Sequence, residues 1–369
     1  MSRWAWVEVS SDAIRHNVHT LARMVEPARV WAVVKADGYG HGSITAARAA
    51  LAGGAQGLCV ALVQEGAALR AAHIDAPVLV LSEQPHEQLR AAIEHRLQLT
   101  VYSVEQVRAL EAAGAVAHPV HMKIDTGMRR VGVPTHRAVE LADIIAASPA
   151  VDLVGVFTHL AVADEPDDPF TESQLDRFDA VLADLAAVGH RPSLVHVANS
   201  AGALAHPRAR YELVRSGIAI YGISPGDGVD HIVASAGLRP ALSLHARVSH
   251  VKGVAAGDGV SYGLRHRFAA DTTVATLPIG YADGVPRRLH ALGGEVLLHG
   301  ERCPIVGVVT MDQLMVDVGA LSVEVGDEAV LIGSQGAHRI TAADWAARLD
   351  TIAYEVVCGL STRLERRIV

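Results

Sequence analysis

The chain has 369 residues, of which half are hydrophobic, and this length accommodates two domains with buried cores. Its 32 basic and 40 acidic residues give a formal net charge of -8 without a long basic run, which argues against nucleic acid as a partner. Three cysteines without CxxC spacing argue against disulfides and against a zinc site, so no metal is predicted and a reducing compartment is expected. No apolar run approaches the roughly 18 residues of a membrane span, and MSRWAWVEVS has no signal-peptide core, so we expect a soluble, cytoplasmic protein without a membrane partner.

The first two predicted elements are a strand and a helix. WAWVEVS at residues 4–10 is typical of a strand, one that can belong to a different domain from the segment that follows it. From about residue 11 to 25, one face of a helix is predicted by four apolar residues at helical spacing, namely Ile14, Val18, Leu21 and Val25.

From about residue 30 to 220, short apolar runs rich in β-branched residues alternate with alanine-rich amphipathic segments. Continuous apolar strands that alternate with helices predict a parallel sheet covered on both faces. Eight such units favour a (β/α)8 barrel of the TIM type, and an open doubly wound sheet stays the alternative. The eight runs lie at residues 30–35, 57–62, 78–82, 97–102, 120–125, 153–159, 193–198 and 211–218.

After about residue 235 the chain becomes dense in predicted strands that glycines separate, with one helix near residues 342–349. This pattern predicts a second, mostly β domain. We therefore expect an α/β barrel domain over residues 1–235 and a β domain over residues 236–369, with the option that the first strand joins the second domain.

Polar residues gather where the predicted barrel strands end. In a (β/α)8 barrel the active site lies at the carboxyl ends of the strands. A single lysine or histidine at such a position is commonly a solvent-exposed residue at a strand end, or a buried residue whose hydrogen bonds are made within the core. Several of them at one barrel mouth are hard to explain by stability alone. The residues in question are Lys35, Lys123, Asp125, His159, His196, Asn199, Ser200 and Arg215.

A lysine in such a place indicates carbonyl chemistry. Burial lowers the pKa of a lysine, which makes it a nucleophile or a base and lets it form a Schiff base. Two classes stay open, an aldolase-type barrel and a pyridoxal phosphate enzyme. The second class needs a phosphate site, for which RSGIAIYG at residues 215–222 offers backbone amides and Tyr39 and Ser200 offer hydroxyls.

The motifs of the whole chain resemble those of alanine racemases. VVKADGYGHG at residues 33–42 is similar to the cofactor-lysine motif of that family. Further similar motifs follow in the family's order, through both predicted domains: KIDTGMRRVGV at 123–133, THLAVAD at 158–164, HVANSAG at 196–202, RSGIAIYG at 215–222, VSYG at 260–263, LPIGYADG at 277–284, GVVTMDQLMVD at 307–317 and YEVVCGLSTR at 354–363.

The resemblance implies a pyridoxal 5'-phosphate-dependent isomerase that interconverts L-alanine and D-alanine. It also implies a homodimer with active sites shared between chains, and a role in supplying D-alanine for peptidoglycan of the cell wall. Lys35 would carry the cofactor as a Schiff base and act as one acid/base group, and Tyr262 of the partner chain would be the other. Arg215 would contact the pyridine nitrogen, and His159 would pack against the ring. The phosphate would be held by Tyr39, Ser200, Gly217, Ile218 and Tyr354.

The same resemblance implies a substrate site. Arg130 would approach the cofactor hydroxyl and the substrate carboxylate, the backbone amide of Met311 from the partner chain would help to bind that carboxylate, and Tyr281 would line the access to the site. Lys123 matches a position that is often carbamylated in the family, which would turn a cation into an anion that faces Arg130.

The chain departs from the family pattern at Arg129, Thr310 and Ser216, and none of these removes a catalytic group. A broad-specificity or serine racemase, and a racemase that also sequesters an alanine-analogue inhibitor, stay open. An amino-acid decarboxylase of the same fold is disfavoured, since such enzymes place an acid where Arg215 stands.

Overall fold

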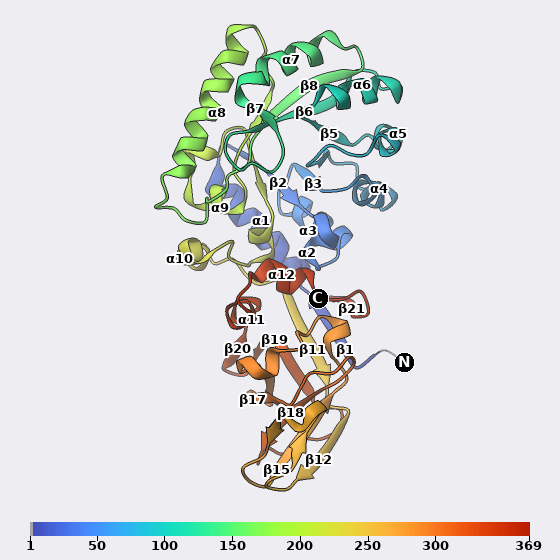
Figure 1. Ribbon diagram of the computed structural model, residues 1–369, viewed down its shortest axis with the longest axis vertical. Coiled ribbons are helices and arrows are strands. Elements are labelled where there is room, and N and C mark those ends of the chain that lie inside the picture. Colours follow the sequence, from blue (N-terminus) through green and yellow to red (C-terminus); the bar gives the residue numbers. More distant parts are fainter. Residues whose placement is uncertain (1–2) are drawn as a thin grey trace. The chain divides into compact units, whose positions relative to one another are not determined.

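The computed structural model describes residues 3–369. The chain divides into two compact units (Figure 1). One unit, the barrel unit, is Asp12–Arg239, and the other, the β unit, combines residues 3–11 with Pro240–Val369.

The barrel unit is a closed barrel of eight parallel strands, which confirms the predicted fold class and rules out the open sheet. The strands follow one another in the order β5-β4-β3-β2-β10-β9-β8-β6, and a pairing between β5 and β6 closes the ring. Each of the eight overlaps a predicted apolar run: β2 (Arg29–Val33), β3 (Gly57–Val60), β4 (Val78–Val80), β5 (Gln98–Val101), β6 (His118–Asp125), β8 (Val151–Phe157), β9 (Leu194–His196) and β10 (Leu213–Ser216).

These strands are apolar because helices cover the outside of the barrel and side chains fill its inside. Every residue of β3, β4 and β10 is buried. One small residue makes room for a large ring in the interior, since a Cβ on Gly155 would lie 2.1 Å from His121 Nδ1. A two-residue strand, β7 (Val133–Pro134), extends the sheet beside β6.

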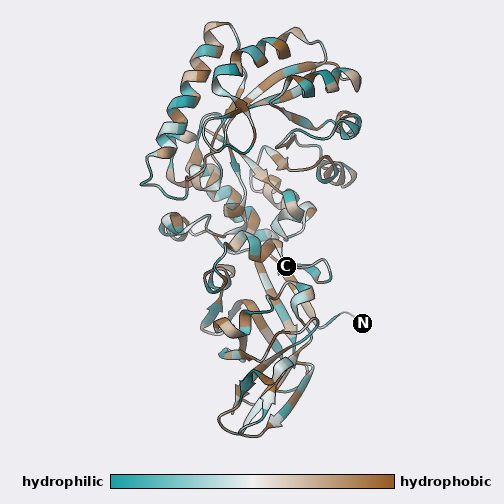
Figure 2. Cartoon of the chain, viewed as in Figure 1, coloured by the Kyte–Doolittle hydropathy of each residue, from teal (hydrophilic) through white to brown (hydrophobic). Residues whose placement is uncertain are grey.

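The helices of the barrel unit carry hydrophobic and hydrophilic residues side by side (Figure 2). The face predicted for α1 is confirmed, because Ile14, Val18, Leu21 and Val25 are all buried. The helices are α1 (Ser11–Val25), α2 (Lys35–Tyr39), α3 (Ser43–Ala52), α4 (Val63–Ala71), α5 (His86–Glu94), α6 (Val104–Ala112), α7 (Ala138–Ala147), α8 (Phe170–Ala187), α9 (Ser200–Ala205) and α10 (Asp230–Ser235).

The β unit is built on one long sheet with the strand order β12-β15-β18-β17-β16-β19-β11-β1-β21. The N-terminal strand β1 lies inside this sheet, antiparallel to β11 and parallel to β21. The strands of this path are β1 (Ala5–Val9), β11 (Leu242–Arg247), β12 (His250–Val254), β15 (Thr272–Leu277), β16 (Glu295–Leu298), β17 (Glu301–Val306), β18 (Leu314–Gly319), β19 (Glu328–Gln335) and β21 (Glu365–Ile368).

Short elements complete the β unit. Strand β20 (His338–Ile340) pairs with β19, and a small ribbon joins β13 (Gly259–Val260) to β14 (His266–Arg267). Helix α11 (Ala342–Leu349) coincides with the predicted helix, and α12 (Ala353–Cys358) follows it. Among residues 3–369 no helix is both long enough and apolar enough to cross a membrane.

Candidate active site

Lys35 follows β2 but does not end it as the sequence predicts. The strand ends at Val33, and Lys35 begins a tight turn in which Ala36, Asp37, Gly38 and Tyr39 have φ of 52°, 51°, 61° and 55°. A left-handed conformation costs about 1–2 kcal/mol for each residue with a side chain. Strain of this kind persists only where the surroundings determine it, and it occurs at functional sites.

Two carboxylates help to hold this turn, one from outside it and one from within it. The Glu65 carboxylate accepts a hydrogen bond from the Ala36 N–H at 2.7 Å and others from the N–H groups of Ala61 and Leu62 at 2.8 and 3.1 Å. The Asp37 carboxylate accepts from the Ser43 N–H at 2.9 Å. Glu65 therefore ties the residue after Lys35 to the end of the neighbouring strand.

Arg215, on β10, is the buried centre of the barrel site. Its Nη1 donates to His196 Nδ1 at 2.7 Å, and its Nη2 donates to the carbonyl oxygens of Thr158 and Val197 at 2.8 and 3.0 Å. His159 Nδ1 lies 3.4 Å from Nη2. Burial lowers the pKa of Arg215 to about 10, so the guanidinium keeps its proton at neutral pH and acts only as a donor.

A chain of hydrogen bonds continues from Arg215 into the barrel. His196 Nε2 lies 2.9 Å from His121 Nδ1, and His121 Nε2 lies 2.9 Å from Gln98 Oε1. Because Arg215 can only donate, His196 Nδ1 must accept, which places the imidazole proton on Nε2 and directs the chain towards Gln98. Burial, followed by the charge of Arg215, lowers the pKa of His121 to about 3 and that of His196 well below its usual value, so both rings stay neutral.

Four of the five predicted phosphate residues, namely Tyr39, Ser200, Gly217 and Ile218, lie close to one another near Arg215 in the barrel unit. Ser200 Oγ accepts from the N–H groups of Gly217 and Ala219 at 2.9 and 3.3 Å. A Cβ on Gly217 would lie 2.5 Å from Tyr39 Oη, so only glycine admits the tyrosine hydroxyl here. Ile218 begins the 3-10 turn η3 (Ile218–Tyr221) that follows. Hydroxyl and amide groups thus converge as a phosphate site requires, and these residues fit pyridoxal phosphate.

Lys123, at the end of β6, is buried near the same cations. Burial, and then the charges of Arg215, Arg130 and Lys35, lower the pKa of Lys123 to about 7. The amine is therefore about half neutral at neutral pH. Asp125 Oδ1 accepts from the N–H groups of Gly127 and Arg129, which shapes the loop that leads to Arg130.

Two residues at the mouth have local roles. The side chain of Arg129 is 75% exposed and lies 3.7 Å from Asp125 Oδ2, so the extra arginine faces solvent and this carboxylate. Asn199 Oδ1 accepts from the Gly202 N–H at 2.9 Å and caps helix α9.

The remaining predicted site residues lie in the β unit. Tyr262, Met311 and Tyr281 are 71%, 53% and 41% exposed. Tyr262 lies in the 3-10 turn η5 (Tyr262–Leu264) and lines a cavity of about 900 Å³ with Ser261, Thr310 and Gln313, among others. Tyr354 lies on α12.

Two family models match the chain, the alanine racemase N-terminal domain over residues 9–225 and the alanine racemase C-terminal domain over residues 241–368. The chain belongs to the alanine racemase family. Curated relatives named alanine racemase include those of Symbiobacterium thermophilum, 48% identical over 99% of this chain and 97% of the relative, and of Nostoc sp., 43% identical over 99% and 96%.

Solved structures of alanine racemases match both units of the chain. The enzyme of Bacillus anthracis with bound L-Ala-P has a TM-score of 0.94 and 39% identity, and the comparison covers 100% of this chain and 96% of that one. The alanine racemase of Streptomyces lavendulae, which produces D-cycloserine, has a TM-score of 0.93 and 38% identity over 100% and 98%.

Within this alanine racemase fold, two acidic residues hold site loops in a way that the sequence does not predict. Glu65 lies in an ordinary helix start, and its contact with the turn after Lys35 is made across 29 residues of sequence. Asp283 belongs to the quoted motif LPIGYADG, but nothing in the motif indicates that its carboxylate is fully buried. A residue pattern does not reveal such long-range partners. The signal that the sequence does offer is an aspartate between glycines, which is typical of a loop held by its side chain.

Proposed function

We propose that this chain is a pyridoxal phosphate-dependent enzyme that interconverts L-alanine and D-alanine. The observation that carries the proposal is the convergence at one barrel mouth of three features: the strained turn after Lys35, the Tyr39–Ser200–Gly217 cluster and the donor-only Arg215. Membership of the alanine racemase family supports alanine as the substrate.

Lys35 would hold the cofactor covalently, Tyr39, Ser200, Gly217, Ile218 and Tyr354 would hold its phosphate, and His159 would pack against its ring. Bound there, pyridoxal phosphate would serve as an electron sink that acidifies the Cα–H bond of alanine. Arg215 would face the ring nitrogen and, as a donor, would leave it unprotonated. We expect this arrangement to weaken the electron sink, which favours return of the proton to Cα over transamination.

Racemisation needs one acid/base group on each face of Cα. Lys35 would exchange the proton on one face, and Tyr262 of the partner chain would exchange it on the other. Both have reference pKa values near 10, so each has to be shifted towards neutrality to act as a base. The 71% exposure of Tyr262 in one chain supports a homodimer, because a catalytic base needs a shielded site.

Arg130 and the Met311 backbone amide would bind the substrate carboxylate, and Tyr281 would line the access to the site. Carbamylation of Lys123 is part of the proposal, because only a neutral amine adds carbon dioxide and the lowered pKa of about 7 provides one. The product would supply D-alanine for the cell wall, from the cytoplasm.

The test is incubation of L-alanine with pure protein and pyridoxal phosphate in heavy water, with D-alanine and deuterium at Cα both followed over time. We expect D-alanine that carries deuterium. Exchange without inversion would contradict the two-base site. Binding of the cofactor with neither exchange nor inversion would exclude alanine, and L-serine in the same assay would then test the broader-specificity alternative.

A further inference from the structure

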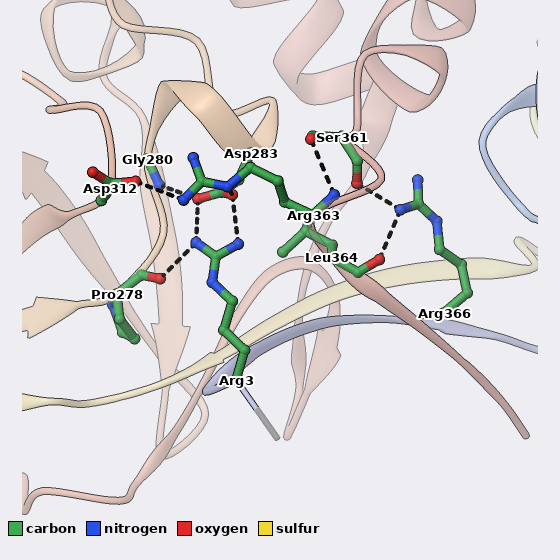
Figure 3. Close-up of polar contacts among 9 residues, drawn as sticks. All are labelled: Arg3, Pro278, Gly280, Asp283, Asp312, Ser361, Arg363, Leu364 and Arg366. Atoms are coloured by element: carbon green, nitrogen blue, oxygen red, sulfur yellow. Dashed lines mark hydrogen bonds and ion pairs between the residues drawn. The ribbon is translucent and has the colours of Figure 1, made fainter. Parts of the chain in front are cut away.

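Asp283 is a fully buried carboxylate in the loop that carries Tyr281. It ends the 3-10 turn η6 (Tyr281–Asp283), and its relative exposure is 0%. Arg3 binds it with both nitrogens of its fork, Nη1 to Oδ1 and Nη2 to Oδ2, each at 2.6 Å (Figure 3). Two-pronged contacts of this kind fix orientation as well as distance.

A second arginine reaches the same carboxylate from the other end of the chain. Arg363 Nε lies 3.4 Å from Asp283 Oδ1, and Arg363 Nη2 lies 2.7 Å from Asp312 Oδ1 (Figure 3). Arg3, Asp283, Asp312 and Arg363, which we call the arginine–aspartate clamp, therefore form a charge-balanced group of two cations and two anions. Its members come from four separate segments of the β unit.

The clamp surrounds two loops that are bonded to each other. The N–H groups of Tyr281 and Ala282 donate to the carbonyl oxygens of Thr310 and Met311 at 2.9 and 3.0 Å. A Cβ on Gly280 would lie 2.3 Å from Thr310 O, so the two backbones are in close contact.

Backbone N–H groups also hold Asp283 in place, through both its carboxylate and its carbonyl oxygen. The Gly280 N–H donates to Asp283 Oδ2 at 3.0 Å, and the Ser361 N–H donates to Asp283 O at 3.1 Å. Any displacement of Asp283 would therefore move Tyr281 and Met311 together.

We propose that the clamp positions Tyr281 and the Met311 backbone for the carboxylate of the substrate. This inference rests on the proposed function, because it takes these two residues as part of the substrate site. Asp283 is buried while the side chains of Arg3 and Arg363 are 29% and 45% exposed. Such an ion pair adds little net stability over apolar residues of similar size, so stability alone does not explain the arrangement. A role in fixing the two loops to within a fraction of an ångström would explain the arrangement, since small misplacements at a reacting site are costly.

The test compares Arg363→Met with Arg302→Met. Arg302 is a matched control in the same unit, an exposed arginine that binds the Glu295 carboxylate at 3.0 Å and the Arg339 carbonyl oxygen at 2.6 Å and touches no clamp residue. For Arg363→Met we expect KM for alanine to rise roughly tenfold while kcat changes less than about threefold. For Arg302→Met we expect neither to change.

Two further measurements separate positioning from a general loss of structure. The dissociation constant of propanoate, which is alanine without its amino group, is measured by calorimetry on the holoenzyme, and it should rise by the same factor as KM. Hydrogen exchange of residues 278–284 and 310–313 should accelerate in Arg363→Met and not elsewhere in the β unit. Arg3→Met, which removes the other arginine, should repeat both effects.

Several results would overturn the inference. One is an unchanged KM and propanoate affinity in Arg363→Met and Arg3→Met. Another is a fall in kcat alone, and a third is a rise in KM that disappears at higher protein concentration, because subunit association would then be the cause. If the unmodified enzyme does not racemise alanine, the proposed function fails instead. In that case, unchanged hydrogen exchange of residues 278–284 and 310–313 in Arg363→Met would still contradict the inference that the clamp holds these two loops.

Discussion

The two units present their proposed catalytic residues in opposite ways. In the barrel unit Arg215, His196 and Lys123 are buried, and the hydrogen-bond partners of Arg215 and His196 come from the same unit. In the β unit Tyr262 and Met311 are more than half exposed. A group that must bind a cofactor is preorganised within one chain, whereas a group exposed to this degree needs another surface to shield it. The contrast fits the proposal that Tyr262 and Met311 serve the active site of a partner chain.

The largest effect should come from the barrel unit. We expect Lys35→Ala to lower racemisation by at least about 10⁴-fold, because it removes a base and the covalent attachment of the cofactor together. The measurement is the rate of D-alanine formation with the absorbance of bound pyridoxal phosphate. Activity within tenfold of the unmodified enzyme would show that another group carries the reaction.

The next effect tests the exposed tyrosine. We expect Tyr262→Phe to lower the rate by about 10³-fold, since one positioned acid/base group is worth roughly 10²–10⁴. Cofactor absorbance should not change. Tyr102→Phe, a partly buried tyrosine of the barrel unit, serves as the control and should retain activity.

Mixing the two inactive variants sharpens the comparison further. In a dimer of Lys35→Ala and Tyr262→Phe chains, shared sites leave one site with an intact lysine and an intact tyrosine. Random reassociation should therefore restore about one quarter of the specific activity, because half of the dimers are mixed and each has one intact site. No recovery, in a mixture shown by mass to exchange subunits, would place both residues of a site in one chain.

A smaller effect should follow from loosening the turn after Lys35. Glu65→Gln keeps one acceptor oxygen but loses the negative charge that the N–H groups of Ala36, Ala61 and Leu62 now share. We expect kcat to fall roughly tenfold, because a slight displacement of the lysine is enough. Glu87→Gln, an exposed acid at the start of α5, is the control. An unchanged kcat in Glu65→Gln would mean that the left-handed turn holds without this carboxylate.

The smallest effect concerns the pH dependence of stability in the barrel unit. The pKa of Lys123 is lowered from 10.5 to about 7 in the folded chain, mainly by burial. The unfolded chain therefore binds more protons between about pH 7 and pH 10.5, and stability contributed by this site rises with pH across that window.

We expect Lys123→Met to remove this contribution, which makes the free energy of unfolding rise with pH by up to about 1.4 kcal/mol per pH unit in this range. The measurement is urea unfolding of the cofactor-free protein in buffer depleted of carbon dioxide, at several values from pH 7.5 to pH 9.5. Equal slopes in the two proteins would contradict the lowered pKa.

The barrel strands could be predicted because most of their residues are buried and they read as short, mainly apolar runs. Their carboxyl ends, and hence the grouping of Lys123, His196, Ser200 and Arg215, followed from the fold rule for such barrels. The left-handed turn could not be predicted, because alanine and tyrosine do not favour positive φ and only their surroundings impose it.

Contacts between polar groups far apart in the sequence could not be predicted either. The arginines that hold Asp283 lie 280 and 80 residues away in sequence, at the two ends of the chain, and no local pattern links them. His121 is similar, since its place in the barrel depends on the absence of a side chain at Gly155. The sequence predicts elements from local periodicity, but which polar groups become partners depends on how those elements pack.

The position of β1 has a consequence for how the protein is made. The strand is synthesised before its neighbours in the sheet, β11 and β21, which begin at Leu242 and Glu365. At roughly 5–20 residues per second, β1 waits on the order of 10–50 s for its first partner. During that time the whole barrel unit emerges and can fold, while an apolar strand at the start of the chain stays unpaired. Unpaired strands of this kind invite aggregation, so we expect folding of the nascent chain to benefit from shielding of β1 until β11 emerges.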